Sequence, residues 1–256
     1  MNNCQFSILF FLIFSTFLYG SGQQEYKGVN TYEYGLEDFN GIDGSSTFEI
    51  EVKRADRFSV LIVADRSLKD KLVVEKRGDN LYLGIKPFTS LGFNTQSPKA
   101  IITMAELSSV QLSGASSMVA AGFKSDKNFT CDLSGSSSLN IDMTGRNFTF
   151  DLSGSSDVTA VIESDRLSIE LSGSCDLEMY GYGNELTADL GGASSADLKD
   201  FSVKKADVEL SGSSNLHINL DGILNIDASG ASNLYYTGNV TLGDIELTGS
   251  SSIKEE

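Results

Sequence analysis

The sequence has little of several residue types on which enzyme sites and nucleic-acid surfaces depend. Its 256 residues include one His, two Pro and no Trp, and 19 Lys and Arg stand against 35 Asp and Glu, giving a formal net charge of −16. One His leaves little room for His-based catalysis or for a metal site built from several His. The negative balance argues against binding to nucleic acid or to anionic membrane surfaces, because both select basic patches. Hydrophobic residues make up 40% of the chain, enough for a continuous core, which argues against disorder.

The first residues have the pattern of an export signal. An almost unbroken apolar run from Phe6 to Tyr19 is followed by the small residues Gly20-Ser21-Gly22, as in a secretory signal peptide. The run is shorter than the roughly 20 residues that a membrane span needs, and no second long apolar run follows. We therefore predict a signal peptide over residues 1–22, a single exported domain over residues 23–256 without a transmembrane segment, and a periplasmic, outer-surface or secreted location.

A Leu-Ser-Gly-Ser-Ser-like element recurs eight times in the second half of the chain. Its copies lie 18 to 21 residues apart and centre on Gly114, Gly135, Gly154, Gly173, Gly192, Gly212, Gly230 and Gly249. Apolar residues stand two and four positions before each glycine and four positions after it. This alternation on both sides of a turn predicts strand–turn–strand, and no 3.6-residue period is present.

A unit of about 19 residues is too short to bury its own apolar face, so the repeats must stack. Stacking in register pairs successive units at about 4.8 Å per layer. The sequence therefore predicts an all-β fold, a single-stranded parallel β-helix with Ser-Gly-Ser turns, right-handed by the general crossover rule. Residues 23–104 would form the N-terminal coils and cap, and residues 105–253 the eight glycine-centred repeats. The turn requires glycine because it needs positive φ or close backbone approach.

One column of the repeat, two residues after each glycine, is expected to point inward. Its members are Ser116, Ser137, Ser156, Cys175, Ser194, Ser214, Ser232 and Ser251. The hydroxyls can hydrogen-bond along the helix axis or to the turn backbone. Cys175 replaces a serine in this column, whereas Cys131 belongs to a strand column two layers away. At about 10 Å along the axis the two are too far apart to bridge, so we predict two buried free thiols.

A second column, three residues before each glycine, is acidic in seven of its eight members. After Gln111 it continues as Asp132, Asp151, Glu170, Asp189, Glu209, Asp227 and Glu246. Like charges stacked one layer apart repel. They must be relieved by splayed side chains and salt screening, or by bound cations. A solvated face that discourages sideways aggregation is the favoured interpretation, and the column is also a weak metal-site candidate for Ca²⁺ or a polycation.

Three other features are candidates for function. Arg77-Gly78-Asp79 spells an integrin-binding tripeptide, but Gly-Asp is ordinary turn chemistry between two strands. His217 falls on the outward side of a strand and is expected to be a surface residue. A polysaccharide lyase or hydrolase would need clustered carboxylates with a basic residue, and Lys and Arg are nearly absent beside the acidic column. We therefore predict no catalytic and no cofactor-binding residues, and no cofactor.

The order of motifs along the chain resembles a known family. A Phe39-x-Gly41-Ile42 opening, a strand at Phe48–Val52, a Gly78-Asp79-Asn80-Leu81-Tyr82-Leu83 turn and strand, and serial Ser-Gly-Ser or Ser-Gly-Ala turns are similar to the "putative auto-transporter adhesin, head GIN domain" family. The resemblance covers residues 34–253. It implies an exported bacterial parallel β-helix without known catalytic residues and with a suggested role in adhesion.

Three functions remain open from the sequence. The favoured hypothesis is a non-enzymatic module for adhesion or cell-envelope interaction, with an unknown protein or glycan as partner, and a homo-oligomer is left open. The first alternative, a carbohydrate-active enzyme, would show a groove with clustered acids and bases. The second, a cation-dependent scaffold, would melt at a higher temperature in Ca²⁺.

Overall fold

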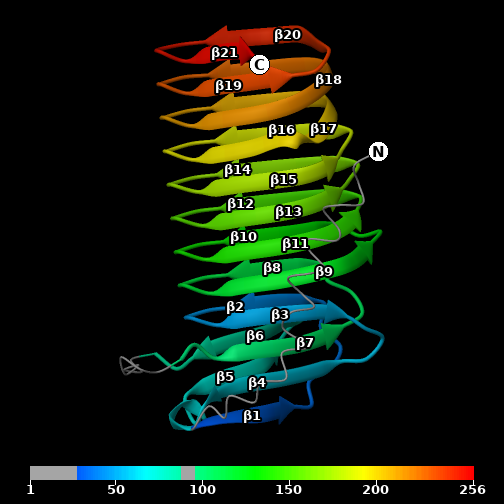
Figure 1. Cartoon of the computed structure of the whole chain (residues 1–256), viewed down its shortest axis with the longest axis vertical. Coiled ribbons are helices and arrows are strands. Elements are labelled where there is room, and N and C mark those ends of the chain that lie inside the picture. Colours follow the sequence, from blue (N-terminus) through cyan, green and yellow to red (C-terminus); the bar gives the residue numbers. More distant parts are fainter. Residues whose placement is uncertain (1–27, 88–95) are drawn as a thin grey trace.

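The described part of the chain is built almost entirely from β-strands. The computed structural model describes residues 28–87 and 96–256 (Figure 1), so the signal peptide predicted over residues 1–22 lies outside it. These residues form 21 strands and one 3-10 helix, η1 (Arg66–Leu68). The chain winds as a parallel β-solenoid of about eight turns with coils of about 19 residues, as predicted from the repeat.

The strands form two walls that face each other across the core. The entry wall holds the strands that lead into a turn: β2 (Gly41–Gly44), β5 (Leu72–Arg77), β6 (Asn80–Ile85), β8 (Ser109–Leu112), β10 (Phe129–Leu133), β12 (Asn147–Leu152), β14 (Arg166–Leu171), β16 (Glu185–Leu190) and β20 (Val240–Leu247).

The exit wall holds the strands that leave the turns: β1 (Val29–Tyr34), β3 (Glu49–Arg54), β4 (Ser59–Asp65), β7 (Lys99–Met104), β9 (Ser117–Ser125), β11 (Ser138–Gly145), β13 (Asp157–Glu163), β15 (Asp176–Tyr182), β19 (Asn233–Thr237) and β21 (Ser252–Glu255). Two long strands bend from the exit wall into the entry wall, β17 (Ser195–Leu210) and β18 (Asn215–Ala228).

The repeat register predicted from the sequence is the register of the parallel ladders. On the entry wall Leu152 pairs with Leu133 and with Leu171. On the exit wall Val158 pairs with Leu139 and with Leu177. Equivalent positions of successive repeats are therefore neighbours throughout the glycine-centred part, and each outward or inward position forms a column along the solenoid axis.

The eight turn glycines stack on one another along one edge of the solenoid, where Figure 1 shows the turns aligned. Their φ angles lie between +72° and +89°. A Cβ built on any of them would stand 2.5–2.7 Å from the carbonyl oxygen of the turn beneath. Both expected reasons for glycine therefore hold at once: the left-handed conformation and the close approach of two backbones.

The inward serine column binds the turn backbone, as predicted. Ser156 Oγ donates to the carbonyl oxygen of Ser153 at 2.8 Å, and Ser137, Ser194 and Ser232 make the same bond three residues back at 2.7–2.8 Å. Cys175 Sγ occupies the equivalent place, 3.2 Å from the Ser172 carbonyl oxygen. Each column member thus satisfies a carbonyl that the turn leaves without a ladder partner.

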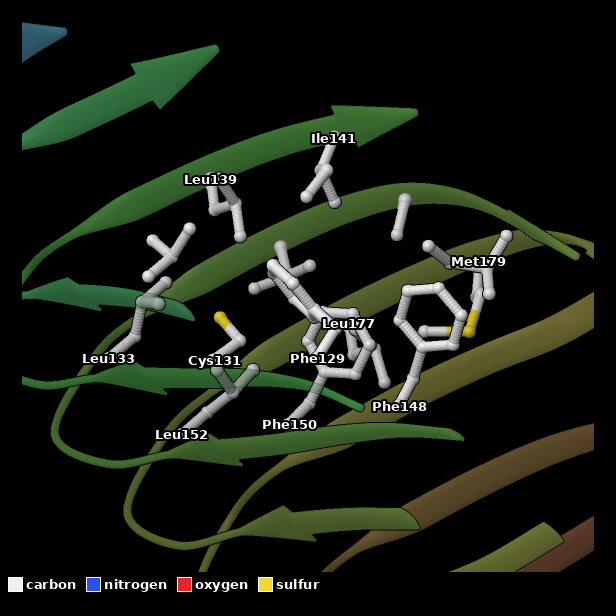
Figure 2. Packing of buried hydrophobic residues seen from close by; sticks show 14 of the residues in the cluster. Phe129, Cys131, Leu133, Leu139, Ile141, Phe148, Phe150, Leu152, Leu177 and Met179 are labelled. Carbon is white, nitrogen blue, oxygen red and sulfur yellow. The ribbon is translucent and has the colours of Figure 1, made fainter. Parts of the chain in front are cut away.

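The core between the walls is a continuous stack of apolar side chains. Figure 2 shows Phe129, Phe148 and Phe150 of the entry wall and Leu177 and Met179 of the exit wall, which all belong to one buried cluster. The ring centroid of Phe129 lies 5.6 Å from that of Phe148 and 6.0 Å from that of Phe150. All are nearly inaccessible to solvent, so the interior is filled and leaves no internal channel among these residues.

Cys131 and Cys175 are both buried and free, which confirms the predicted pair of unpaired thiols. Cys131 stands in the apolar column of the entry wall, between Val110 and Phe150. Burial raises the pKa of both thiols, so both stay protonated at neutral pH.

The first coils do not follow one another along the solenoid axis in the order of the chain. β2 and β3 precede β6 and β7 along the chain, yet β2 lies between β6 and β8, and β3 between β7 and β9. The chain next builds toward the N-terminal end, adding β4, β5, β6 and β7, and then returns to β8. Antiparallel pairs close this end: β5 with β6, β4 with β7 and β1 with β4. These antiparallel strands form a cap at the N-terminal end, and the coils next to it are interleaved in chain order.

The glycine stack predicts that replacing a glycine by alanine destabilises the fold more where the new Cβ would collide with backbone than where only the φ angle is unfavourable. Gly122 has φ +76° and no atom within 4 Å of the place where a Cβ would stand, whereas Gly154 has φ +78° and the Gly135 carbonyl oxygen 2.6 Å from that place. Gly122→Ala should cost about 1–2 kcal/mol for conformation alone. Gly154→Ala should lower the free energy of unfolding by at least ~3 kcal/mol, because backbone must also shift. Urea unfolding of both variants measures the difference, and equal losses would contradict the close stacking.

The two thiols allow a second matched pair of substitutions, Cys175→Ser and Cys131→Ser. Cys175→Ser places a hydroxyl where six other coils already bury one, so the free energy of unfolding should change by less than about 0.5 kcal/mol. Cys131→Ser puts a hydroxyl into an apolar column beside Phe150 and should cost about 1–3 kcal/mol. Chemical denaturation checks both variants. A larger loss at Cys175 than at Cys131 would show that the inward columns are wrongly assigned.

Candidate interaction surface

The acidic column forms one uninterrupted row on the outer side of the entry wall. The parallel ladders pair Gln111 with Asp132 and continue member by member to Glu246. All seven carboxylates are exposed. The stacking predicted from the sequence is therefore present, with one carboxylate per coil facing water.

Cation binding by this column stays a prediction. Within residues 28–87 and 96–256, no three His, Cys, Asp or Glu side chains converge as a metal site requires. A row of parallel carboxylates can still attract cations as a line of charge, without any of them enclosing one ion.

A second outward column, two residues further from the turn, runs beside the acidic one. It begins with hydroxyls and becomes acidic or amide-bearing toward the C-terminal end: Ser109, Thr130, Thr149, Ser168, Thr187, Asp207, Asn225 and Asp244. The two columns together give the entry wall a polar outer surface whose negative charge increases along the axis.

The two columns meet in a shallow hollow near the C-terminal end of the entry wall. It has a volume of about 670 Å³. Its polar lining consists of Thr187, Asn225 and six carboxylates, Asp189, Asp207, Glu209, Asp227, Asp244 and Glu246, and its apolar lining of Ala188, Val208, Ile226 and Ile245. Asn225 Nδ2 donates to Asp207 Oδ1 at 2.6 Å, and Lys205 Nζ lies 2.5 Å from Asp207 Oδ2. These two hydrogen bonds lower the pKa of Asp207, which keeps it ionised well below neutral pH.

A column of alternating charge on the same wall was not foreseen from the sequence. Arg166 pairs with Glu185, and Glu185 with Lys205, in successive coils. Arg166 Nε is 2.9 Å from Glu185 Oε2, with both side chains more than half exposed. Extending the repeat alignment seven residues before each glycine would have revealed this column. The few basic residues of the region therefore lie on the wall itself, beside the acidic rows.

The outer side of the exit wall carries a short aromatic stack at its C-terminal end. His217 is a surface residue, as predicted, and its ring stacks on Tyr235 at 4.5 Å with an interplanar angle of 12°. Lys254 Nζ lies 5.4 Å from the Tyr235 ring, and His217 Nδ1 is 3.4 Å from Glu256 Oε2. Both faces of Tyr235 are thus occupied by neighbours in its own column.

Arg77-Gly78-Asp79 forms the turn between β5 and β6. Gly78 has φ +60°, and Arg77 pairs with Asn80 across the hairpin. The Arg77 guanidinium lies 3.3 Å from the centroid of the Tyr82 ring and pairs with Glu75 at 2.7 Å. The arginine is engaged in local contacts, which supports the turn interpretation over an integrin ligand.

The charge environment of two glutamates on neighbouring strands predicts opposite effects of the same substitution. Glu170 stands between Asp151 and Asp189, whereas Glu185 stands between Arg166 and Lys205. At low ionic strength Glu170→Gln should raise the free energy of unfolding by a few tenths of a kcal/mol, about 0.2–1. Glu185→Gln should lower it by a similar amount. Thermal melts at low and high salt test this, since both effects should shrink on screening.

The triple substitution Asp151→Asn, Glu170→Gln and Asp189→Asn extends the same test to cations. Relief of repulsion predicts a modest rise in melting temperature at low salt. If the wild type is instead stabilised by Ca²⁺ and the triple variant loses that stabilisation, the column is a cation site and the solvated-face interpretation is wrong.

Comparisons with known proteins agree with this architecture. A crystal structure of a "putative lipid binding protein" from Parabacteroides distasonis superposes with a TM-score of 0.83 at 21% identity, covering 90% of this chain and 98% of that one. A "putative adhesin" from Parabacteroides merdae gives 0.79 at 17% identity, covering 90% and 97%. A "putative adhesin" from Bacteroides fragilis gives 0.66 at 18% identity, covering 90% and 98%. At these identities the likeness shows the fold alone.

No curated protein matches the chain. No helix in the described residues is long and apolar enough to cross a membrane. The family model described as "Putative auto-transporter adhesin, head GIN domain" matches residues 38–240, which is most of the chain and confirms the resemblance seen in its motifs. The chain therefore belongs to the auto-transporter adhesin head GIN domain family.

Proposed function

We propose that this protein is an exported, non-enzymatic β-solenoid that binds a protein or glycan at the cell surface through the outer side of its entry wall. One observation carries the proposal: seven exposed carboxylates lie in one row, one per coil, beside a second row of hydroxyl, amide and carboxylate groups. The signal peptide over residues 1–22 and a single domain over residues 23–256 belong to the same proposal.

A row of side chains at a regular spacing suits an extended, repetitive or multiply charged partner. Each coil adds about 4.8 Å, so a partner that contacts one carboxylate can contact the next without bending. Individual exposed contacts of this kind are weak, and affinity would come from their number, as in multivalent binding. Family membership and the adhesin names of similar structures support a role at a surface.

The alternatives predict different features. A carbohydrate-active enzyme would place an acid and a base around one bond, whereas the carboxylates of the hollow face water along an open wall. A lipid-binding role, after the name of one similar structure, would have to use the outer surface, because the described interior is packed with buried side chains.

Binding of the purified protein to immobilised glycans and to intact bacterial or host cells tests the proposal. Asp151→Asn, Glu170→Gln and Asp189→Asn together should weaken binding at least ~10-fold, since three adjacent contacts are lost. The matched control, Asp157→Asn, Asp176→Asn and Glu178→Gln, removes the same charge from the exit wall and should leave binding unchanged.

Two results would contradict the proposal. One is equal loss of binding in both triple variants, which would point to net charge instead of the entry wall. The other is the release of sugar fragments from a polysaccharide incubated with the wild type, which would show an enzyme.

A further inference from the structure

The two ends of the solenoid are finished differently. At the N-terminal end antiparallel strands cover the last parallel coil, and two apolar residues of this cap, Leu68 in η1 and Leu72 in β5, are 1% and 9% exposed. At the C-terminal end β20 pairs only with β18, and β21 only with β19, among the described residues. Figure 1 shows β20 and β21 as the last strands of the stack, with no strand beyond them in the described part of the chain. Their outer edges therefore present main-chain donors and acceptors without ladder partners, as do the outer edges of β1 and β5, so the ends differ in their apolar side chains and not in their strand edges.

The last coil also leaves core positions uncovered. Leu242, Ile245 and Leu247 continue the inward columns of the entry wall and are 49%, 39% and 42% exposed. Their partners one coil earlier, Leu224, Ile226 and Ala228, are 0%, 4% and 0% exposed. Apolar side chains of the same columns are therefore buried in the coil before the last and about half exposed in the last coil, because no described coil stacks on it.

We propose that two copies of this chain join end to end through their C-terminal coils, each covering the open face of the other. The inference goes beyond the proposed surface binding and does not depend on it. A free solenoid end of this kind combines an apolar patch with unpaired strand edges, and natural repeat proteins cover such ends.

A second copy fits because, among the described residues, only the C-terminal one of the two solenoid ends leaves large hydrophobic side chains exposed. The N-terminal end also has free strand edges, at β1 and β5, but no described residue there is an exposed large hydrophobic, so a head-to-tail contact would lack an apolar match. C-terminal end against C-terminal end is an isologous contact about a two-fold axis. Such an axis reverses strand direction, so β20 and β21 meet the partner's edges as antiparallel pairs, which hydrogen-bond well.

The size of the end face is at the lower limit for a specific dimer. Strand β20 has eight residues, or about 26 Å at the usual rise, and two walls about 10 Å apart with their side chains give a width of about 20 Å. Two such faces in contact bury about 1,000 Å² in total, which is the smallest area typical of specific interfaces.

Charge selects one of the two ways of joining the faces. With the two-fold axis along the strands, β20 of one copy meets β21 of the other. Asp244 lies five residues before Gly249 and Lys254 five residues after it. Asp244 of each copy therefore lies opposite Lys254 of the other copy, which gives two pairs of opposite charge per dimer. With the axis across the strands, β20 of one copy meets β20 of the other. Asp244 and Glu246 of one copy then come close to the same two residues of the other copy. The first arrangement is the one proposed, since stacked like charges are destabilising.

Sedimentation velocity of the purified protein across the micromolar range tests the proposal. The wild type should shift from the monomer mass to twice that mass as concentration rises. Added salt should strengthen association, because the two copies carry like net charge. Leu242→Glu and Leu247→Glu should each weaken the dimer about 100-fold or more, by burying an unpaired charge in an apolar contact.

The matched control is Ile223→Glu, which makes the same kind of change at a residue of equal exposure, 47%, on the side of the solenoid. It should leave the dimer affinity unchanged. Lys254→Asp tests the contact from a surface position that leaves the interior intact, and it should weaken association. Adding Asp244→Lys to Lys254→Asp should restore it.

Several outcomes would overturn the proposal. A wild type that stays monomeric over the whole range would do so, whether or not it binds phosphatidylcholine vesicles, which would show a lipid covering the end. Higher multiples of the monomer mass would indicate head-to-tail growth. Equal effects of Leu242→Glu and Ile223→Glu, or no restoration by the charge exchange, would place the contact elsewhere.

Discussion

The carbonyl oxygen of one turn lies 2.5–2.7 Å from the place where the next turn would carry a Cβ. This close approach allows successive coils to stack at the strand-pairing distance along one edge of the molecule. Only glycine, which has no Cβ, can occupy the turn position at this distance. Because every glycine-centred coil passes through it, the glycine stack holds the register of both walls. The apolar columns, the serine column and the outward carboxylates follow from the same register, and a slip of one residue would exchange inside for outside.

The same constraint separates the parts of the chain that the sequence could predict from those it could not. From Gly114 onward each copy repeats the same pattern, so period and parity were enough to place Cys131, Cys175 and the acidic column correctly. The earlier coils lack the glycine. Ser46 takes the turn position beneath Gly114 with φ +73°, in a left-handed conformation that glycine usually supplies. Without the repeat, nothing in the sequence indicates that β4 pairs antiparallel with β1 and β7, or β5 with β6.

Side-chain chemistry was harder to predict than strand position. The Arg166, Glu185 and Lys205 column lies seven residues before the turn glycines, outside the alignment of four residues on each side that located the other columns. The hollow lined by Asp207 and Asn225 depends on the conformations of neighbouring side chains, which the sequence repeat does not indicate. The open C-terminal face follows from the lack of a covering coil in the described chain, so the sequence pattern of Leu242 and Leu247 is that of core residues although they are half exposed in the structure.

The central claim is that the positions three residues before each glycine form one straight column, which a distance measurement can test directly. Spin labels placed at Gln111 and Glu246 span seven coil steps, and labels at Gln111 and Asp189 span four. Electron–electron double resonance should give separations of about 34 Å and about 19 Å, in the ratio of the coil steps. The buried native thiols should not take up label. Distances that fail to grow in this ratio would show that the repeats do not stack in one register, and the account would be wrong.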